Sequence, residues 1–164
     1  MSTHDNLKDA FAGESQANRK YLAYAKKAEQ DKFPGIGKLF RAAAHAETVH
    51  AHSHLRAMGG VNDTVTNLKD AVGGESFEFT KMYPPYVEEA KLEGNAAAER
   101  SFAYAMTVEK THFDLYSAAL AAAQSGKDIA AQKFYVCPVC GHTVADGHPD
   151  KCPVCGSVKW DEIV

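Results

Sequence analysis

Residues 47–50 read Glu-Thr-Val-His, and residues 109–112 repeat the pattern as Glu-Lys-Thr-His. Each pair lies in a long run without Gly or Pro that is rich in Ala, Leu, Lys and Glu, which is the composition of an α-helix. Side chains three residues apart on a helix lie on one face, about one turn apart, so one metal ion can contact both Glu and His. The repeated pair therefore predicts a metal site built on helices.

Gly and Pro residues divide the first part of the chain into four expected helices, at about residues 4–31, 36–57, 65–93 and 96–124. The third must accommodate Gly73-Gly74 and Pro84-Pro85, so we expect a bend in it. After Gln132 the sequence changes to β-branched and aromatic residues with Cys-Pro and Cys-Gly turns. We therefore expect a helical domain over residues 1–130 and a small domain over residues 131–164.

Each expected helix has an inner seam, the row of residues spaced alternately three and four apart that faces the centre of a bundle. All four seams are apolar except at one level, where each becomes acidic. A buried carboxylate without a partner costs several kcal/mol, so converging carboxylates require cations between them. The Glu and His residues at this level are Glu14, Glu47, His50, Glu75, Glu78, Glu109 and His112.

Two Glu-x-x-His pairs with a Glu from each remaining helix form the ligand set of a di-iron or di-manganese carboxylate site. Mixed oxygen and nitrogen ligands suit these metals better than soft metals. One Glu-x-x-His pair alone is common on solvated helix faces, but two pairs in register with Glu14 and Glu75 favour metal binding. Glu78 could be redundant, because a helix with two seam carboxylates could use one of them. His54, one turn from His50, is interpreted as a supporting or surface histidine.

All four cysteines of the chain lie in two Cys-Pro-Val-Cys-Gly motifs near its end: Cys137, Cys140, Cys152 and Cys155. Two Cys-x-x-Cys turns supply four thiolates with tetrahedral reach, and the following Gly permits a positive φ. The spacing fits zinc and a single iron equally well. A neighbouring redox-active metal pair favours iron, because an iron centre could exchange electrons with that pair.

The composition excludes several classes of function. The 164 residues carry a formal net charge of −3 and no basic block, which argues against a nucleic-acid partner. No apolar run approaches the roughly 20 residues of a membrane span. The first residues are charged where a signal peptide is apolar, so we expect a cytoplasmic protein.

Together these motifs resemble the rubrerythrin family over nearly the whole chain. The resemblance rests on Ala12-Gly13-Glu14-Ser15-Gln16-Ala17, Glu47…His50, Gly74-Glu75…Glu78 with Met82-Tyr83-Pro84, Glu109…His112 and the four-cysteine tail. It implies a mainly α-helical protein, a ferritin-like four-helix bundle followed by a rubredoxin-like domain, with two iron ions in the bundle and one in the four-cysteine site. It also implies a peroxidase that reduces hydrogen peroxide to water. Its electrons would come from NAD(P)H-linked donors, a reductase or a rubredoxin, through the four-cysteine iron to the di-iron site.

The resemblance also implies a role for each ligand. Glu47 and Glu109 match bridging carboxylates, and Glu14, Glu75 and His112 match terminal ligands.

His50 and Glu78 match the two residues that exchange at one iron when its oxidation state changes. The chain departs from the family pattern at His142, where rubredoxin-like domains often carry Tyr. This leaves the metal ligands intact and could alter the reduction potential.

Two other functions remain open from the sequence. A ferritin-like ferroxidase or iron-storage protein would need neither Glu78 nor a redox module, and a metal-binding or electron-transfer module would have no turnover. For the assembly we expect a homodimer that exchanges helices. In a ferritin-like bundle the second and third helices run parallel, and the link at residues 58–64 is too short to return along the bundle. Helices three and four of one chain would then complete the bundle of another.

Overall fold

The computed structural model describes residues 2–164 as helices followed by a small antiparallel sheet. The helices are α1 (Thr3–Gln30), α2 (Pro34–Ala57), α3 (Thr64–Phe77), the π-helix η1 (Glu78–Met82), α4 (Tyr83–Leu92) and α5 (Ala96–Gln124). The strands are β1 (Phe134–Val136), β2 (Thr143–Ala145) and β3 (Asp161–Ile163). The four expected helices correspond to α1, α2, the run from α3 to α4, and α5.

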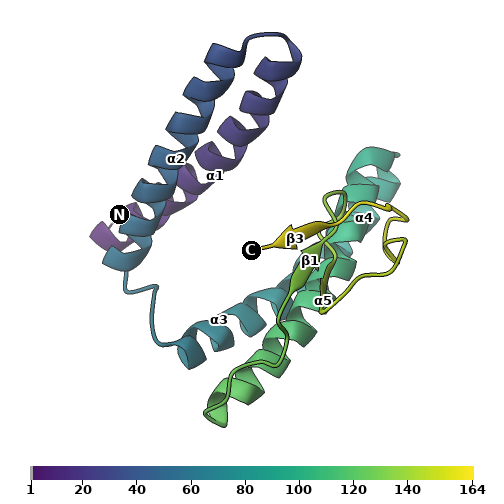
Figure 1. Cartoon of the computed structure of the whole chain (residues 1–164). Helices are drawn as coiled ribbons and strands as arrows, with labels where there is room; N and C mark the ends of the chain where they lie inside the picture. The colour runs from purple at the N-terminus through teal and green to yellow at the C-terminus, as the bar shows by residue number, and fades with distance from the viewer. Residues whose placement is uncertain (1) are drawn as a thin grey trace. The chain divides into compact units, whose positions relative to one another are not determined.

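Helices α1 and α2 form a hairpin that is one of two compact units of the chain, ending at Asn62 (Figure 1). Ser2 caps α1 in a capping box with Asp5, and Pro34 occupies the first turn of α2, where its missing N–H costs nothing. The helices meet on small side chains, so that Ala25 and Ala44 are almost fully buried. Larger apolar side chains of this hairpin remain accessible, such as Leu39, which is 69% exposed.

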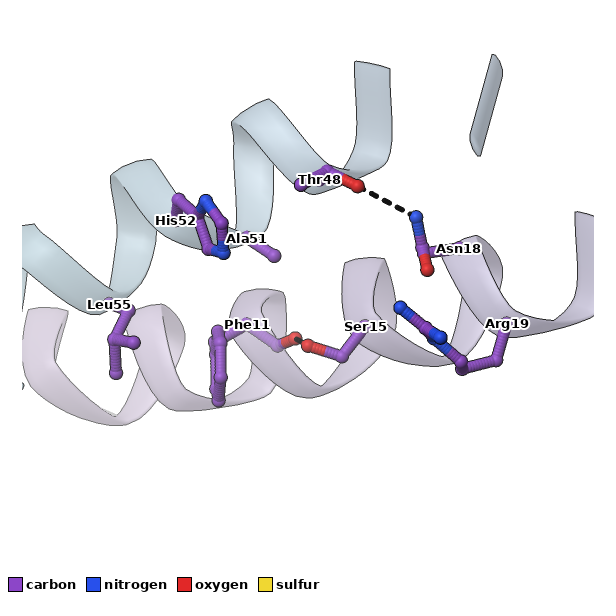
Figure 2. A pocket seen from close by; sticks show the side chains of 8 residues that line it. All are labelled: Phe11, Ser15, Asn18, Arg19, Thr48, Ala51, His52 and Leu55. Atoms are coloured by element: carbon purple, nitrogen blue, oxygen red, sulfur yellow. Dashed lines mark hydrogen bonds between the residues drawn. The ribbon is translucent and has the colours of Figure 1, made fainter. Parts of the chain in front are cut away.

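One polar side chain, Asn18, is buried between α1 and α2. Its Nδ2 donates a hydrogen bond to the Ala44 carbonyl oxygen at 2.7 Å. It donates a second to Thr48 Oγ1 at 2.8 Å (Figure 2). It borders a pocket of this hairpin that is also lined by Phe11, Ser15, Arg19, Thr48, Ala51, His52 and Leu55. None of the predicted metal ligands lines this pocket, so it is separate from the metal chemistry.

The second unit extends from Asp63 to Val164 and contains the second helical hairpin, in which α3, η1 and α4 pack along α5. Asp63 and Asn95 cap α3 and α5 through their side-chain oxygens. Helix α3 continues through Gly73-Gly74, and the interruption comes later, as the π-helix η1 ahead of Pro84-Pro85. A π turn changes the local hydrogen-bonding register and so lets a helix accommodate residues that lack an N–H.

The four-cysteine tail belongs to this second unit. Its sheet has the order β2-β1-β3, with Tyr135 paired to Val144 on one side and to Glu162 on the other. Strand β2 contacts α5. The boundary expected near residue 130 remains a prediction.

Within residues 2–164, no helix combines the length and the apolar character needed to cross a membrane.

Candidate metal centres

The α1–α2 hairpin brings together three of the predicted ligands. Nδ1 of His50 lies 2.9 Å from Oε2 of Glu47 on the same helix and 3.9 Å from Oε1 of Glu14 on α1. One ligand atom from each residue falls within 4.8 Å of the others. The spacing of three residues in α2 therefore delivers a carboxylate and an imidazole to one point, as the sequence predicts, and α1 adds the second carboxylate.

The second hairpin repeats this arrangement. Nδ1 of His112 lies 2.7 Å from Oε2 of Glu109 on α5 and 3.8 Å from Oε1 of Glu75 on α3. These three residues also place one ligand atom each within 4.8 Å of the others. The carboxylates are mostly buried, with side chains 19% exposed for Glu75 and 17% for Glu109. Each unit thus presents two carboxylates and one imidazole.

The electrostatics of the second group favour a cation. Burial first, and then a hydrogen bond with the Glu109 carboxylate and the negative charge of that group, together raise the pKa of Glu75 to about 7. Two carboxylates that share one site cannot both ionise easily unless a positive charge lies between them. Oxygen and nitrogen donors in this number fit Fe or Mn, so the residues present suit the metals predicted from the sequence.

Glu78 lies on η1, outside the group formed by Glu75, Glu109 and His112. Its pKa is raised, first by burial and then by the charge of Glu109, while His112 has the opposite effect. The charges of Glu109 and His112 therefore act on the Glu78 carboxyl group. The pKa of Tyr83 is also raised, by burial and then by the charges of Glu78, Glu109 and Glu75.

The four cysteines belong to the C-terminal part of the second unit, and their side chains lie close together. All four Sγ atoms lie within 4.8 Å of one another, and the Cys137–Cys155 and Cys140–Cys152 pairs are 3.5 Å apart. A tetrahedral metal with metal–sulfur distances of about 2.3 Å would separate neighbouring sulfurs by about 3.8 Å, so the cluster fits a Zn or Fe ion.

The two turns that carry these cysteines are equivalent. In each, the Gly after the second Cys donates its N–H to the carbonyl oxygen of the first Cys at 2.8 Å. Gly141 has a φ of 85° and Gly156 a φ of 76°, as expected from the motif. Burial disfavours the Cys137 thiolate, but hydrogen bonds from the backbone of Cys140 and Val139 outweigh it and lower the pKa of Cys137 to about 7. Burial raises the pKa of Cys140, so the thiols do not all ionise readily without a metal.

A contact that the sequence does not reveal joins the cysteine module to the second ligand group. Nε2 of His112 lies 3.0 Å from Oγ1 of Thr143, which follows the first cysteine turn. His142, beside it, lies near Thr111 of α5 and has a lowered pKa, first because of burial and then because of the charge of His112. Thr143 carries no motif signal, because its role depends on how the tail packs against α5.

Comparisons with known proteins agree with this reading. The sequence model of the rubrerythrin family matches residues 5–120. Rubrerythrin-2 of Clostridium acetobutylicum is 39% identical over 98% of this chain and 95% of its own length, and nigerythrin of Nitratidesulfovibrio vulgaris is 34% identical over 94% and 82%. The structure of nigerythrin in its fully reduced, all-ferrous state is similar with a TM-score of 0.58 and 31% identity, over 99% of this chain and 87% of that one.

These similarities confirm the expected fold class, a ferritin-like helical bundle with a rubredoxin-like four-cysteine module. They also confirm the expected cofactors, two iron ions in the bundle and one at the cysteines. The chain belongs to the rubrerythrin family.

Proposed function

We propose that this protein reduces hydrogen peroxide to water with electrons that pass from an NAD(P)H-linked donor through the four-cysteine iron to a di-iron site. The rubrerythrin family consists of di-iron oxidative-stress proteins with peroxidase-type activity, and that broader description applies to this chain. The observation that carries the finer proposal is the combination of two carboxylate–imidazole groups with a four-thiol group in one chain.

The di-iron ligands that we propose are Glu14, Glu47, His50, Glu75, Glu78, Glu109 and His112. When bound, the iron pair supplies the two electrons that reduce hydrogen peroxide, and the four-cysteine iron replaces them one at a time. Carboxylates can bridge two metals, a role that we assign to Glu47 and Glu109. Each imidazole would bind a single metal.

We assign to His50 and Glu78 the alternative ligation of one iron in its two oxidation states. Two features support this assignment. The side chain of His50 is 55% exposed within its hairpin, whereas that of His112 is 27% exposed. Glu78 lies on a π-helix, and such turns often occur at functional sites. These two features support the assignment of the exchange to His50 and Glu78.

The electron donor that we propose is a reductase or a rubredoxin that docks at the four-cysteine module. Cys137 and Cys152 are buried, but Cys140 and Cys155 are partly exposed. Val139, next to Cys140 in the chain, is 60% exposed, so a partner protein can approach this side of the module. We place the protein in the cytoplasm, because four thiols held for a metal require a reducing compartment.

The assembly that we propose is a homodimer in which helices are exchanged. A di-iron site forms only if the ligands on the α1–α2 hairpin and those on the α3–α5 hairpin lie at the same height along the bundle axis. Helix α2 continues for seven residues beyond His50, and α3 begins eleven residues before Glu75, so a returning link must cover about 27 Å along the axis at 1.5 Å per residue. Six residues, 58–63, separate the helices, and the seven Cα–Cα steps from Ala57 to Thr64 reach about 23–25 Å when fully extended.

The start of this link is also folded back on α2. Gly59 and Gly60 donate their N–H groups to the carbonyl oxygens of Arg56 and Leu55, at 2.9 Å each, and Gly59 has a φ of 70°. This is a helix-ending motif that shortens the reach of the link further. The α3–α5 hairpin of a second chain would then complete the bundle that α1 and α2 begin.

Turnover measured together with iron accounting tests the proposed function. Anaerobically reduced protein with iron in all its sites should oxidise rapidly on addition of hydrogen peroxide. With NADH and a rubredoxin reductase it should continue to consume peroxide. Glu109→Gln should lose this turnover. Glu93→Gln makes the same substitution at an exposed Glu and should keep it. Retention of added iron as mineral, without sustained peroxide consumption, would instead favour iron storage.

A further inference from the structure

Thr143 links the cysteine module to a proposed iron ligand through two hydrogen bonds. Its Oγ1 lies 3.0 Å from Nε2 of His112, and the same hydroxyl group donates to the carbonyl oxygen of Gly141 at 3.0 Å. Gly141 directly follows Cys140 in the chain. The hydroxyl group is part-buried, in the contact between β2 and α5.

The direction of these bonds decides which nitrogen of His112 carries a proton. A threonine hydroxyl group has one hydrogen and two lone pairs. Since that hydrogen goes to the Gly141 carbonyl oxygen, Oγ1 can only accept from His112, and Nε2 must therefore carry the N–H. With a metal bound, the lone pair of the neutral ring would then lie on Nδ1, the nitrogen that faces Glu109 and Glu75, and the metal would take the place of the proton that the 2.7 Å contact with Glu109 otherwise needs.

We infer that Thr143 is a positioning residue for His112. It fixes the imidazole in the Nε2–H form and directs Nδ1 towards iron. The inference rests on the proposed role of His112 as an iron ligand. Metal-bound histidines generally donate their other N–H to an acceptor that orients the ring and raises its basicity, and loss of such an acceptor typically lowers metal affinity or activity about 10- to 100-fold.

The position of the acceptor gives this contact a second consequence. The group that holds His112 is not on the helical hairpin but on the module that carries the four cysteines. Val108, one residue before Glu109, is buried, and a Cβ built on Gly141 would lie only 3.7 Å from its side chain. The first cysteine turn therefore packs on the helical segment that holds both proposed ligands. The packing of the cysteine module on α5 and the orientation of His112 therefore depend on each other.

Three variants test the inference. Thr143→Val keeps the shape of the side chain and removes the hydroxyl group, whereas Thr143→Ser keeps the hydroxyl group. Thr107→Val is the matched control, because its hydroxyl group is exposed and bonds only within α5, to the Ala103 carbonyl oxygen. Affinity for Fe(II) is measured anaerobically by competition with a chelator. Thr143→Val should weaken one bundle iron about 10- to 100-fold, while Thr143→Ser and Thr107→Val stay near the wild-type affinity.

The visible absorption of the four-cysteine iron shows whether the module remains folded in each variant. Wild-type affinity in a folded Thr143→Val protein would overturn the inference. If that variant does not fold, ¹⁵N NMR of the wild-type protein loaded with diamagnetic Zn(II) decides the matter. His112 should carry its proton on Nε2, and a proton on Nδ1 would overturn the inference. Neither measurement uses peroxide or NAD(P)H, so a failure of the peroxidase proposal would be seen separately.

Discussion

Oε1 of Glu75 on α3 lies 3.8 Å from Nδ1 of His112 on α5, and Oε2 of Glu109 lies 2.7 Å from the same nitrogen. Two segments far apart in the sequence thus place two carboxylates and one imidazole together. The hairpin tolerates this arrangement in the metal-free state at an electrostatic cost, which appears as the pKa of Glu75, raised to about 7 by burial and by Glu109. That cost has consequences for pH, metal binding and stability.

The stability of the metal-free protein should depend on pH through Glu75. Its carboxyl group has an ordinary pKa of 4.5 and a folded-state pKa of about 7, so the folded state holds the proton over a pH range in which the unfolded state has lost it. The contribution is fully present below about pH 4.5 and is lost as the pH rises through 7. Thermal unfolding of the wild type and Glu75→Gln between pH 4.5 and 7.5 should show a shallower decline in the variant. Identical declines would contradict the prediction.

Replacing Glu109 with Ala should remove both bundle metals, because we assign this carboxylate a bridging role between them. The measurement is the iron content of the purified protein, counted separately from the four-cysteine iron by its visible absorption. Asp114→Ala is the control on the same helix, since its side chain is 58% exposed and pairs with Lys110. Full occupancy of both bundle metals in Glu109→Ala would show that the ligand assignment is wrong.

Exchanging the four-cysteine iron for zinc should abolish turnover that depends on NAD(P)H. Zinc has no accessible redox change, and its tetrahedral fit to four thiolates preserves the fold of the module. Oxidation of a chemically pre-reduced di-iron site by peroxide should survive the exchange. The two rates are compared in one preparation, and unchanged NAD(P)H-linked turnover after the exchange would refute the relay role.

Asn18→Ala should destabilise the first hairpin without changing its metal ligands. The variant loses the two hydrogen bonds to Ala44 and Thr48 from a side chain that is 7% exposed. At about 1 kcal/mol for each bond, the free energy of unfolding should fall by about 2 kcal/mol. Denaturant unfolding of the iron-loaded protein measures this change. Asn6→Ala on the same helix, where the side chain is exposed, serves as the comparison.

The sequence predicts the helices, and it predicts which Glu, His and Cys side chains lie close together, because both depend on local spacing. Glu-x-x-His places its two side chains on one helix face whatever the surroundings, and the two Cys-x-x-Cys-Gly turns specify their own backbone. The π-helix at Glu78–Met82 was not predicted, since the sequence shows only that Pro84-Pro85 must be accommodated and not by which distortion. Thr143 was missed for a different reason. Its contact with His112 forms only when the tail packs on α5, and such non-local packing leaves no periodic signal.

The helix-exchanged dimer predicts a specific pattern of complementation. A chain with Glu14→Ala and a chain with Glu109→Ala carry lesions in different hairpins. If helices are exchanged, the heterodimer contains one intact site and one site with both lesions. Random association of equal amounts makes half of the dimers mixed, so about a quarter of wild-type peroxidase activity should return. If helices are not exchanged, every site retains one lesion and no activity returns.

A second mixture controls for unspecific effects of association. Glu14→Ala and Glu47→Ala both alter the α1–α2 hairpin, so every site of their heterodimer carries one lesion with or without exchange. The chains are unfolded together, refolded and reloaded with iron before peroxide consumption is measured. Activity in the first mixture well above that in the second supports the exchange. Equal residual activity in both mixtures would show that α3 returns to its own chain, and that the six-residue link reaches farther than its folded Gly59-Gly60 turn indicates.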